Sequence, residues 1–504
     1  MRQLSIFLVV LMIVPAIVHA QQVTYSEINT KDNRDMNFEI LGKMNGNYVI
    51  YKNLTWKHSL AIYDKDMRIA KTISLGFIPD RTFNIDFITY PDYFYMIYQY
   101  QKNKIVYCMG VKMGIDGSKL GEPVQLDTTR IPVLADNKIY NTIYSQDKQR
   151  IMVYKVQERY QIHNLMTKLF DSNLQMIDST RMAVDFDSKR EIYQDLSVDN
   201  EGNYVFAKAG KKTYSDLLDG IELYLRKPNT KDFKTIEIKL DGRFIDGIAI
   251  KIDNLNKHYI LNSLFYNQER GNIKGLYTMI INSATMDTIK SAFNIFPDAL
   301  RDKANSAKFK SAFDNFFIRQ AIVRKDGGFI LTSEDYSTED RGNSNNYFNR
   351  YNYLYNSNNF SSYDYYYSPA YGYYRPWNTY SNWQNTRYYY ENILILSFDK
   401  DLNMEWNNII PKEQTDDDND NFLSFSTMNV GGEIRFLYSD KGRQIITNQS
   451  VLPDGQMRRY PTLKSHEAGF EFMPRHAKQV GYNELIIPCI YRTNIAFAKV
   501  VFND

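Results

Sequence analysis

Short apolar stretches that follow tight turns recur along nearly the whole chain. In one such unit, Asp326, Gly327 and Gly328 precede the apolar run 329–331. Such turns often need a positive φ, which Gly tolerates freely and Asn or Asp tolerate best among the other residues. Equivalent turns are centred on Gly46, Asp92, Asp147, Gly202, Asn256, Gly327, Gly432 and Asn483. Most of these centres lie about 50 residues apart, and a repeat of that length built from short strands predicts a β-propeller.

Each repeat divides into four short strands joined by turns, which is the pattern of a propeller blade. In the first repeat we expect strands at 38–41, 48–51, 60–63 and 69–75. The last repeat lacks a fourth strand, while the segment 23–28 has no repeat of its own. We therefore predict an all-β chain with eight blades, closed by 23–28 pairing with 495–502, because closure hides two strand edges. Seven blades is the alternative if one of the weaker turns is not a blade turn.

The repeat units resemble a known class of propellers. The residues that carry this resemblance are Asp199 to Val205, Asp326 to Leu331 and the Phe-Asp-x-x-Leu hairpins at Phe170 and Phe398. They resemble secreted bacterial β-propellers of the NHL and TolB-like kind. The resemblance covers most of the repeats and implies the architecture, but it implies no activity, because propellers host enzymes and binding proteins alike.

Two insertions account for the long spacings between turns. Residues 297–310 begin with Pro and Asp and continue Ala- and Lys-rich, which predicts a short helix. Residues 341–392 are rich in Tyr, Asn and Ser and show no strand or helix period, which predicts a long loop. If the strands of a blade are called a to d, both insertions fall on the face that carries the b–c loops. We expect the other b–c loops to be long as well, and we expect the function on this face.

The N-terminal residues 1–20 read as a signal peptide, with Arg2 followed by an apolar core and a small residue at Ala20. We therefore expect residues 21–504 to form an exported propeller, periplasmic or at the cell surface, without a membrane span in the mature chain. Cys108 and Cys489 each lie inside an apolar strand, in blades that the repeat map does not make neighbours. We expect both thiols to be unpaired and buried.

Composition and motifs exclude several classes of function. The net charge of +3 with 61 basic and 58 acidic residues gives no basis for nucleic-acid binding. His466 and Glu467 begin like a zinc-protease motif, but Phe470 stands where the second His is required. The run 416–420 offers oxygen ligands without the turn Gly and distal Glu of an EF-hand, so a solvated acidic loop is favoured over Ca²⁺ binding. We expect no cofactor, and metal binding stays open.

The favoured function is therefore non-enzymatic binding or scaffolding. The long-loop face and the Tyr-rich loop would contact an envelope or surface protein or a glycan, because aromatic side chains with interleaved cations favour recognition. The alternative is a glycan- or peptide-acting propeller enzyme whose carboxylates line the centre. Enzymatic activity stays open, and no catalytic residue is assigned. The candidate binding residues are Trp56, His58, Arg159, Tyr160, Lys211, Tyr214, Arg270, Tyr366, Tyr373, Trp377 and Trp383.

Overall fold

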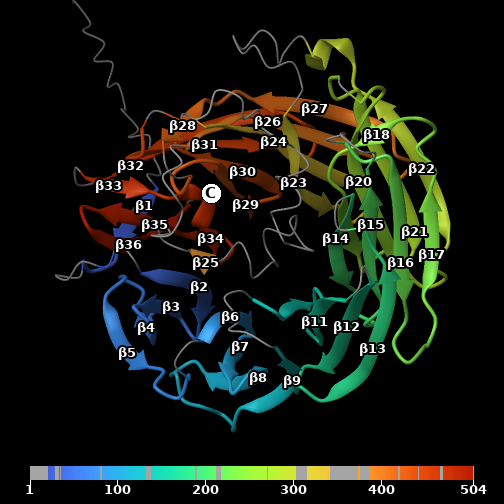
Figure 1. Ribbon diagram of the computed structural model, residues 1–504. Coiled ribbons are helices and arrows are strands. Elements are labelled where there is room, and N and C mark those ends of the chain that lie inside the picture. The colour runs from blue at the N-terminus through green and yellow to red at the C-terminus, as the bar shows by residue number, and fades with distance from the viewer. Residues whose placement is uncertain are drawn as a thin grey trace, which may run out of the picture.

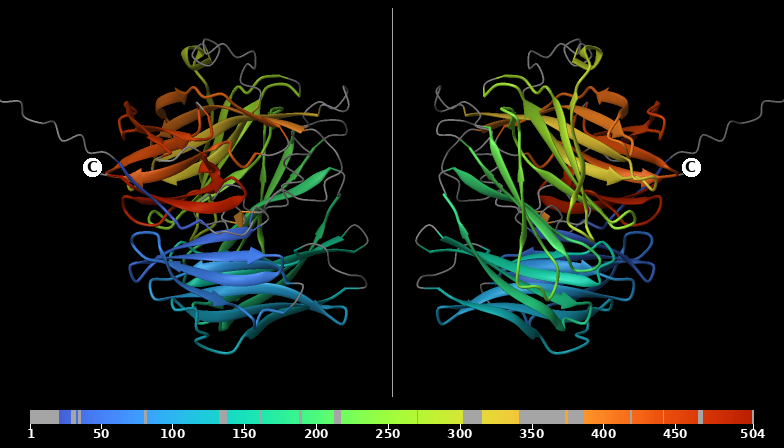
Figure 2. Two further views of the ribbon diagram at one scale, coloured as in Figure 1. Left: turned by 90° about the vertical axis from the view of Figure 1, so that its left-hand side faces the viewer. Right: turned by 90° about the vertical axis from the view of Figure 1, so that its right-hand side faces the viewer.

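The protein is an eight-bladed β-propeller. A computed structural model describes residues 21–502, apart from 29–32, 34–35, 80–81, 132–137, 160–161, 188–189, 212–216, 270, 302–314, 341–372, 375–385, 418–419, 441 and 466–468. Eight antiparallel sheets stand in chain order around a common centre, with the first strand of each sheet toward the middle of the ring (Figure 1). Figure 2 shows the same ring from two sides, with the strands crossing its thickness. The predicted count of eight blades is confirmed.

Each blade is a four-stranded meander, and four of the eight sheets contain a fifth, short strand. Blade 1 contains β2 (Asn37–Met44), β3 (Asn47–Leu54), β4 (Lys57–Tyr63) and β5 (Ile69–Ser74). Blade 2 contains β6 (Thr82–Thr89), β7 (Tyr93–Lys102), β8 (Ile105–Gly114) and β9 (Val124–Arg130). Blade 3 contains β10 (Asn141–Tyr144), β11 (Arg150–Arg159), β12 (Ile162–Asp171) and β13 (Met176–Asp185). Blade 4 contains β14 (Glu191–Val198), β15 (Tyr204–Gly210), β16 (Gly220–Arg226) and β17 (Lys234–Ile238).

The second half of the ring repeats this plan. Blade 5 contains β18 (Phe244–Ile245) and β19 (Ala249–Asp253) on β20 (His258–Tyr266), then β21 (Gly275–Asn282) and β22 (Thr288–Ile295). Blade 6 contains β23 (Phe316–Val323), β24 (Phe329–Asp340), β26 (Thr386–Phe398), β27 (Met404–Ile410) and β28 (Gln414–Asp417). Blade 7 contains β29 (Phe425–Val430), β30 (Glu433–Tyr438), β31 (Ile445–Val451) and β32 (Met457–Lys464). Blade 8 contains β33 (Phe470–Phe472) and β34 (Lys478–Gln479) on β35 (Glu484–Tyr491), then β36 (Asn494–Val501), and a short 3₁₀ turn, η1 (Pro474–His476).

The N-terminal strand closes the ring. Strand β1 (Gln22–Tyr25) pairs antiparallel with β36, with Gln22 opposite Val501 and Tyr25 opposite Ala498. The Tyr25 ring also packs against Phe470, with the centres of the two rings 4.4 Å apart. Blade 8 therefore takes its outermost strand from the other end of the chain, as the unassigned N-terminal segment predicts.

The hydrophobic core is a ring of layers between neighbouring blades rather than one central cluster. One cluster joins Ile88 and Val106 of blade 2 to Ile151 and Val153 of blade 3, and comparable clusters fill the other interfaces between adjacent blades. The inner strands are buried on both faces, so they read as continuous apolar runs such as β20. The outermost strands contain many exposed residues, as in β5 and β13, because they lie at the rim of the ring.

The turns between strands c and d explain the recurring Phe-Asp-x-x-Leu pattern. In blade 3, the Asp171 carboxylate accepts hydrogen bonds from the backbone N–H groups of Asn173 and Gln175, each at 2.8 Å. Leu174 takes a positive φ of 58° there and is buried. A buried Leu accepts this left-handed backbone because its side chain fills the blade interface. Met67 and Leu402 repeat the feature in blades 1 and 6.

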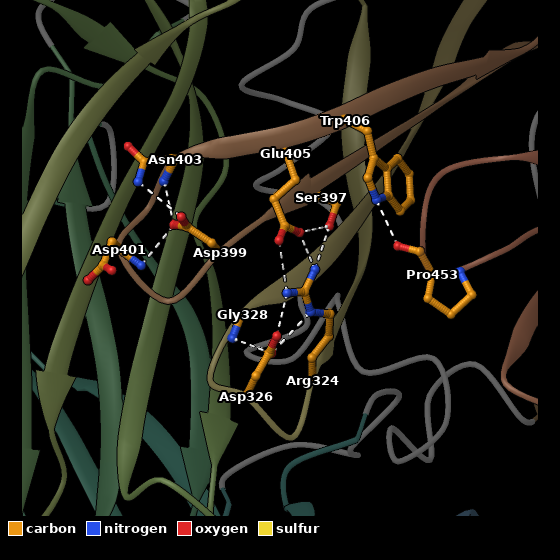
Figure 3. Close-up of polar contacts among 10 residues, drawn as sticks. All are labelled: Arg324, Asp326, Gly328, Ser397, Asp399, Asp401, Asn403, Glu405, Trp406 and Pro453. Carbon is orange, nitrogen blue, oxygen red and sulfur yellow. Dashed lines mark hydrogen bonds and ion pairs between the residues drawn. The ribbon is translucent and has the colours of Figure 1, made fainter.

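Polar contacts tie the turns of blade 6 together at the face opposite the insertion (Figure 3). Arg324 pairs with both Asp326 and Glu405, and Ser397 donates a 2.9 Å hydrogen bond to Glu405. The Trp406 indole donates a 3.0 Å hydrogen bond to the backbone oxygen of Pro453 in blade 7, which links the two blades near their outer edge.

The predicted helix at 297–310 is described only in part. Residues 298–301 are helical, and the remainder from 302 lies outside the described residues. No helix in the described part of the chain is both long and apolar enough to cross a bilayer. Cys108 and Cys489 are unpaired and buried, as expected.

Candidate functional site

Strand order places every b–c connection on one face of the ring, together with the links from each blade to the next. The long insertion between β24 and β26 lies on this face, as does the helical turn at 298–301 between blades 5 and 6. The expectation that the other b–c loops are also long is wrong for several blades. Thr55 and Trp56 alone join β3 to β4, and Asn103 and Lys104 alone join β7 to β8. All four residues have a positive φ, which is the geometry of a two-residue hairpin.

The insertion starts from an extended stem. Strands β24 and β26 are 12 and 13 residues long, and they stay paired up to Asp340 opposite Thr386. Strand β28 adds a third strand to this extension, with Gln414 opposite Tyr390 and Asp417 opposite Arg387. Residues 386–392, which we expected to be loop, are therefore part of β26. The Tyr-rich segment leaves the blade from a three-stranded base.

A buried ion pair lies at the root of this stem. The Lys412 ammonium lies 2.7 Å from the Glu334 carboxylate, and both side chains are 0% exposed. Arg319 approaches the second carboxylate oxygen at 3.1 Å, and Ser424 of the segment before blade 7 donates to it at 2.7 Å. Lys412 also donates to the backbone oxygen of Tyr390 at 3.1 Å. Burial lowers the pKa of Lys412, although the Glu334 charge opposes this effect.

A second polar cluster holds the stem against blades 7 and 8. The Tyr390 hydroxyl donates a 2.7 Å hydrogen bond to the Asp420 carboxylate, which is also paired with Arg475. The Arg475 guanidinium lies 5.7 Å from the centre of the Tyr390 ring. His476 follows Arg475 in the 3₁₀ turn, and one of its ring nitrogens lies 3.2 Å from the side-chain oxygen of Asn421. Three blades thus meet around one tyrosine.

Burial and the mutual pairing set the charge states in this second cluster. Burial acts to raise the pKa of Asp420, but the Arg475 charge and the hydrogen bonds from Tyr390 and Arg475 together hold that pKa below its usual value. Burial would lower the pKa of Arg475, yet the Asp420 carboxylate raises it well above the usual value. Burial, together with the Arg475 charge, lowers the pKa of His476 to about 3. At neutral pH the cluster therefore contains a charged Asp–Arg pair beside a neutral imidazole.

A short strand within the insertion reaches the opposite part of the ring. Strand β25 (Tyr373–Tyr374) pairs antiparallel with β2 of blade 1, with Tyr373 opposite Glu39 and Tyr374 opposite Phe38. It lies on the edge of β2 that faces the middle of the ring (Figure 1). The insertion therefore begins on blade 6 and touches blade 1.

The Glu39 carboxyl beside this strand is an unusual acid. Its side chain is buried, and burial raises its pKa to about 8, with Lys478 opposing the shift and Asp86 adding to it. Lys138 pairs with Asp86 at 3.0 Å. A carboxyl of raised pKa beside other charged groups is the arrangement that catalytic acids use, although structural clusters show it as well.

The structure describes only some of the candidate binding residues, and these lie on different blades. Trp56 lies at its hairpin turn with 60% exposure. His58 points inward instead, because its Nδ1 lies 2.6 Å from the hydroxyl of buried Tyr51. Arg159 ends β11, Lys211 follows β15, and Tyr373 is in β25. Tyr160, Tyr214, Arg270, Tyr366, Trp377 and Trp383 lie outside the described residues, as does His466.

The acidic run 416–420 differs from the expected solvated loop. Asp416 is buried and pairs with Arg443 at 2.7 Å, and Asp417 pairs with Arg387 at 2.8 Å. Asp420 belongs to the Tyr390 cluster described above. Each of these three carboxylates is therefore paired with an arginine. Within the described residues, no group of three or more His, Cys, Asp or Glu side chains is placed to bind a metal ion.

Sequence reasoning missed Glu334, Lys412, Tyr390 and Arg475. The partners lie far apart in sequence, and no local motif marks them. One signal in the sequence could have found the buried carboxylates, namely an acidic residue inside a predicted strand. Glu334 directly follows the strand run 329–333, and Glu39 stands between Phe38 and Ile40. A charged residue in a strand buried on both faces must find a partner.

Comparisons with known proteins found similar solved structures, but no protein-family model and no curated protein sequence matches the chain. It is similar in structure to a prolyl endopeptidase (9% identity, TM-score 0.39), covering 91% of this chain and 54% of that one. It is also similar to the β-propeller domain of the Trilobed protease from Pyrococcus furiosus (8%, TM-score 0.36, covering 84% and 97%). A third similar structure is the periplasmic gluconolactonase of Pseudomonas aeruginosa (9%, TM-score 0.37, covering 85% and 96%).

These similarities concern the fold alone. The chain spans about half the length of the prolyl peptidases that it matches. The solved neighbours include enzymes, and at such low identity they assign neither activity nor partner to this chain. The NHL or TolB-like assignment stays a prediction.

Proposed function

We propose that this propeller is an exported, non-enzymatic binding or scaffold protein. In this proposal it contacts a partner protein or a glycan at the periplasmic or cell surface, through the b–c face and the Tyr-rich insertion. The observation that supports it most strongly is the anchored stem of that insertion. Two buried polar clusters, around Glu334 and around Asp420, fix β24, β26 and β28 against the neighbouring blades.

A fixed base favours binding for an energetic reason. A recognition segment loses conformational freedom when it binds, and that loss subtracts from the affinity. Here the stem residues from 386 to 390 are already paired in a strand before any partner arrives, so they lose little conformational freedom on binding. Burying Lys412 and Glu334 fully is costly compared with apolar residues of similar size. The presence of this costly pair at the base of the insertion supports the view that the insertion must be held in a defined position.

The composition of the insertion supports recognition as well. Its many Tyr side chains supply a large contact area with few rotatable bonds, and its Asn and Ser residues supply adaptable hydrogen bonds. The stem itself presents Tyr389, whose hydroxyl donates a 2.7 Å hydrogen bond to Glu339.

The test compares three forms of the full chain. In the first variant a Gly-Asn turn replaces residues 341–385, which joins Asp340 to Thr386 where the strands already pair. In the second, Tyr390→Phe removes the hydroxyl that donates to Asp420 and keeps the insertion. Each form is used for capture from envelope extract and on a glycan array, after its folding has been checked by circular dichroism.

We expect the deletion to remain folded and to lose the partners that the wild type captures. Tyr390→Phe should weaken capture less, because the insertion is present but its base is looser. Unchanged binding by the deletion variant would refute the proposal. If the deletion variant loses its partners while Tyr390→Phe captures them like the wild type, the insertion is the contact surface. In that case the anchored base has no role in binding.

A glycan- or peptide-acting enzyme is the second candidate, and Glu39 is the observation that favours it. Its raised pKa keeps a proton available near neutral pH, as a general acid requires. Turnover of a glycan and peptide library by the wild type that disappears in Glu39→Gln would favour the enzyme. No turnover by either form would leave Glu39 a structural acid.

A further inference from the structure

A cleft between blades 2 and 3 is separate from the face discussed above. Blades 2 and 3 lie on the other side of the ring from blade 6 (Figure 1). The cleft has a volume of about 300 Å³, at the small end of the range for ligand sites. One wall is formed by Asp127 of β9, the outermost strand of blade 2, and by Tyr140 before β10. The other wall is one face of blade 3.

Strand register shows how the face of blade 3 is built. Residues opposite each other in antiparallel strands point to the same side of the sheet. Lys155 is opposite Met166, and Met166 is opposite Arg181, so these three form one row across β11, β12 and β13. Val153, Lys168 and Ser179 form the adjacent row in the same way. On this face, the apolar side chains of Val153 and Met166 therefore lie beside three cationic side chains and the Ser179 hydroxyl.

The cations follow a gradient from the depth of the cleft to its rim. Lys155 is buried, with its ammonium 2.7 Å from Asp127 and 2.7 Å from the Thr129 hydroxyl. Lys168 is half-buried and lies 3.0 Å from the other Asp127 oxygen. Arg181 is exposed at the rim, where its Nε donates to Asn164 at 3.1 Å.

The charges of the cleft do not balance. Burial acts to raise the pKa of Asp127, but the hydrogen bonds and the charges of Lys155 and Lys168 together hold that pKa below its usual value. The single carboxylate therefore stays ionised and is shared by two ammonium groups. Arg181 makes no ion pair with a described residue. The cleft is lined by three cations, Lys155, Lys168 and Arg181, and by one carboxylate, Asp127. Two positive charges therefore face the space without a matching carboxylate among the lining residues.

We propose that this cleft binds a small polyhydroxylated oxyanion of monosaccharide size, a sugar bearing a carboxylate or a phosphate. Its anionic group meets Lys168 and Arg181, because guanidinium and ammonium groups form strong charge-assisted hydrogen bonds with oxyanions. Its hydroxyls face Ser179, and its apolar ring face lies on Val153 and Met166. A purely structural role would account for one Lys on Asp127, but not for the second Lys and the rim Arg on the same face.

Isothermal titration calorimetry with four probes tests this proposal on the full chain. Galacturonate and glucose 6-phosphate are the anionic probes, and galactose and glucose are their neutral counterparts. We expect at least one anionic probe to bind and both neutral sugars to fail. Binding by galacturonate alone identifies a carboxylate site, and binding by glucose 6-phosphate alone identifies a phosphate site.

Two variants connect any binding to the cleft. Arg181→Gln and Lys168→Gln should each weaken the anion about tenfold or more, the value of one lost hydrogen bond between charged groups. Arg459→Gln, a change at an exposed cation on the outermost strand of blade 7, is the matched control and should have no effect. The proposal is overturned if neither anion binds at millimolar concentration, if the neutral sugars bind equally well, or if the two cleft variants bind like the control. The result is independent of the insertion, so it can fail or succeed apart from the proposed function.

Discussion

Removing the Glu334 charge should destabilise the protein far more than removing a surface carboxylate. Glu334→Gln keeps the shape of the side chain but leaves the Lys412 ammonium and the Arg319 guanidinium without the carboxylate that both contact, at 2.7 and 3.1 Å. Both partners of the Lys412 pair are 0% exposed, so water cannot replace the lost charge. Breaking a buried pair in this way costs about 3–5 kcal/mol of the free energy of unfolding.

A double-mutant cycle separates the pair from its surroundings. Lys412→Met should also destabilise, but by less, because Arg319 and Ser424 still contact Glu334. In the combined Glu334→Gln and Lys412→Met variant, no ammonium is left unpaired. Its cost should therefore fall below the sum of the single costs by about 1 kcal/mol or more.

Urea unfolding, followed by circular dichroism and intrinsic fluorescence, gives these free energies. The matched control is Glu122→Gln, since Glu122 is 87% exposed in a 3.1 Å pair with Lys119. It should cost less than about 1 kcal/mol. A loss of under about 1 kcal/mol for Glu334→Gln, or strict additivity in the cycle, would refute the view that this ion pair holds the stem.

Further predictions concern closure, pH and the thiols. Deleting residues 21–26 should expose the edge of β36 and cause association, and a monomeric variant of unchanged melting temperature in light scattering would contradict this. Stability should fall as pH drops from about 6.5 toward 3, because the unfolded chain protonates His476 while the folded chain does not; His476→Gln should flatten this slope in melts over that range. Glu39 acts in the opposite sense, since the folded form holds a proton that the unfolded form releases from about pH 4.5 to 8. Stability should therefore decline as pH rises through that window, and Glu39→Gln melts should lack the decline. Cys108 and Cys489 should react with Ellman's reagent only after unfolding, because burial raises the pKa of both thiols; rapid labelling of the folded chain would show that the strands open.

The blade count could be predicted because its signals are local. Each blade has a turn whose Asp, Asn or Gly residues are fixed by backbone geometry within a few positions, as Asp171 and Leu174 illustrate. The closing strand could be predicted from the number of strands, because the last repeat lacks its fourth strand and the segment 23–28 belongs to no repeat. These arguments need no knowledge of distant contacts.

The polar base of the insertion could not be predicted in this way. Tyr390 looks like one more residue of a Tyr-rich loop, yet it is buried, and its partners Asp420 and Arg475 belong to other blades. Composition set the predicted loop to end at 392, whereas pairing with β24 carries the strand back to Thr386. His58 was misplaced for a related reason, because alternation along β4 turns it toward Tyr51 rather than toward the face.

The pairing of β1 with β36 also sets the order in which the molecule can be completed. The ribosome makes β1 before any blade and β36 after all the others, so the first strand must wait unpaired until the last one exists. Contacts between residues so distant in sequence form slowly, because the chain between them must first be ordered. Seven blades can assemble as synthesis proceeds, but the final seam is sealed only when the whole chain is present. A truncated chain therefore retains an open edge that marks it as unfinished.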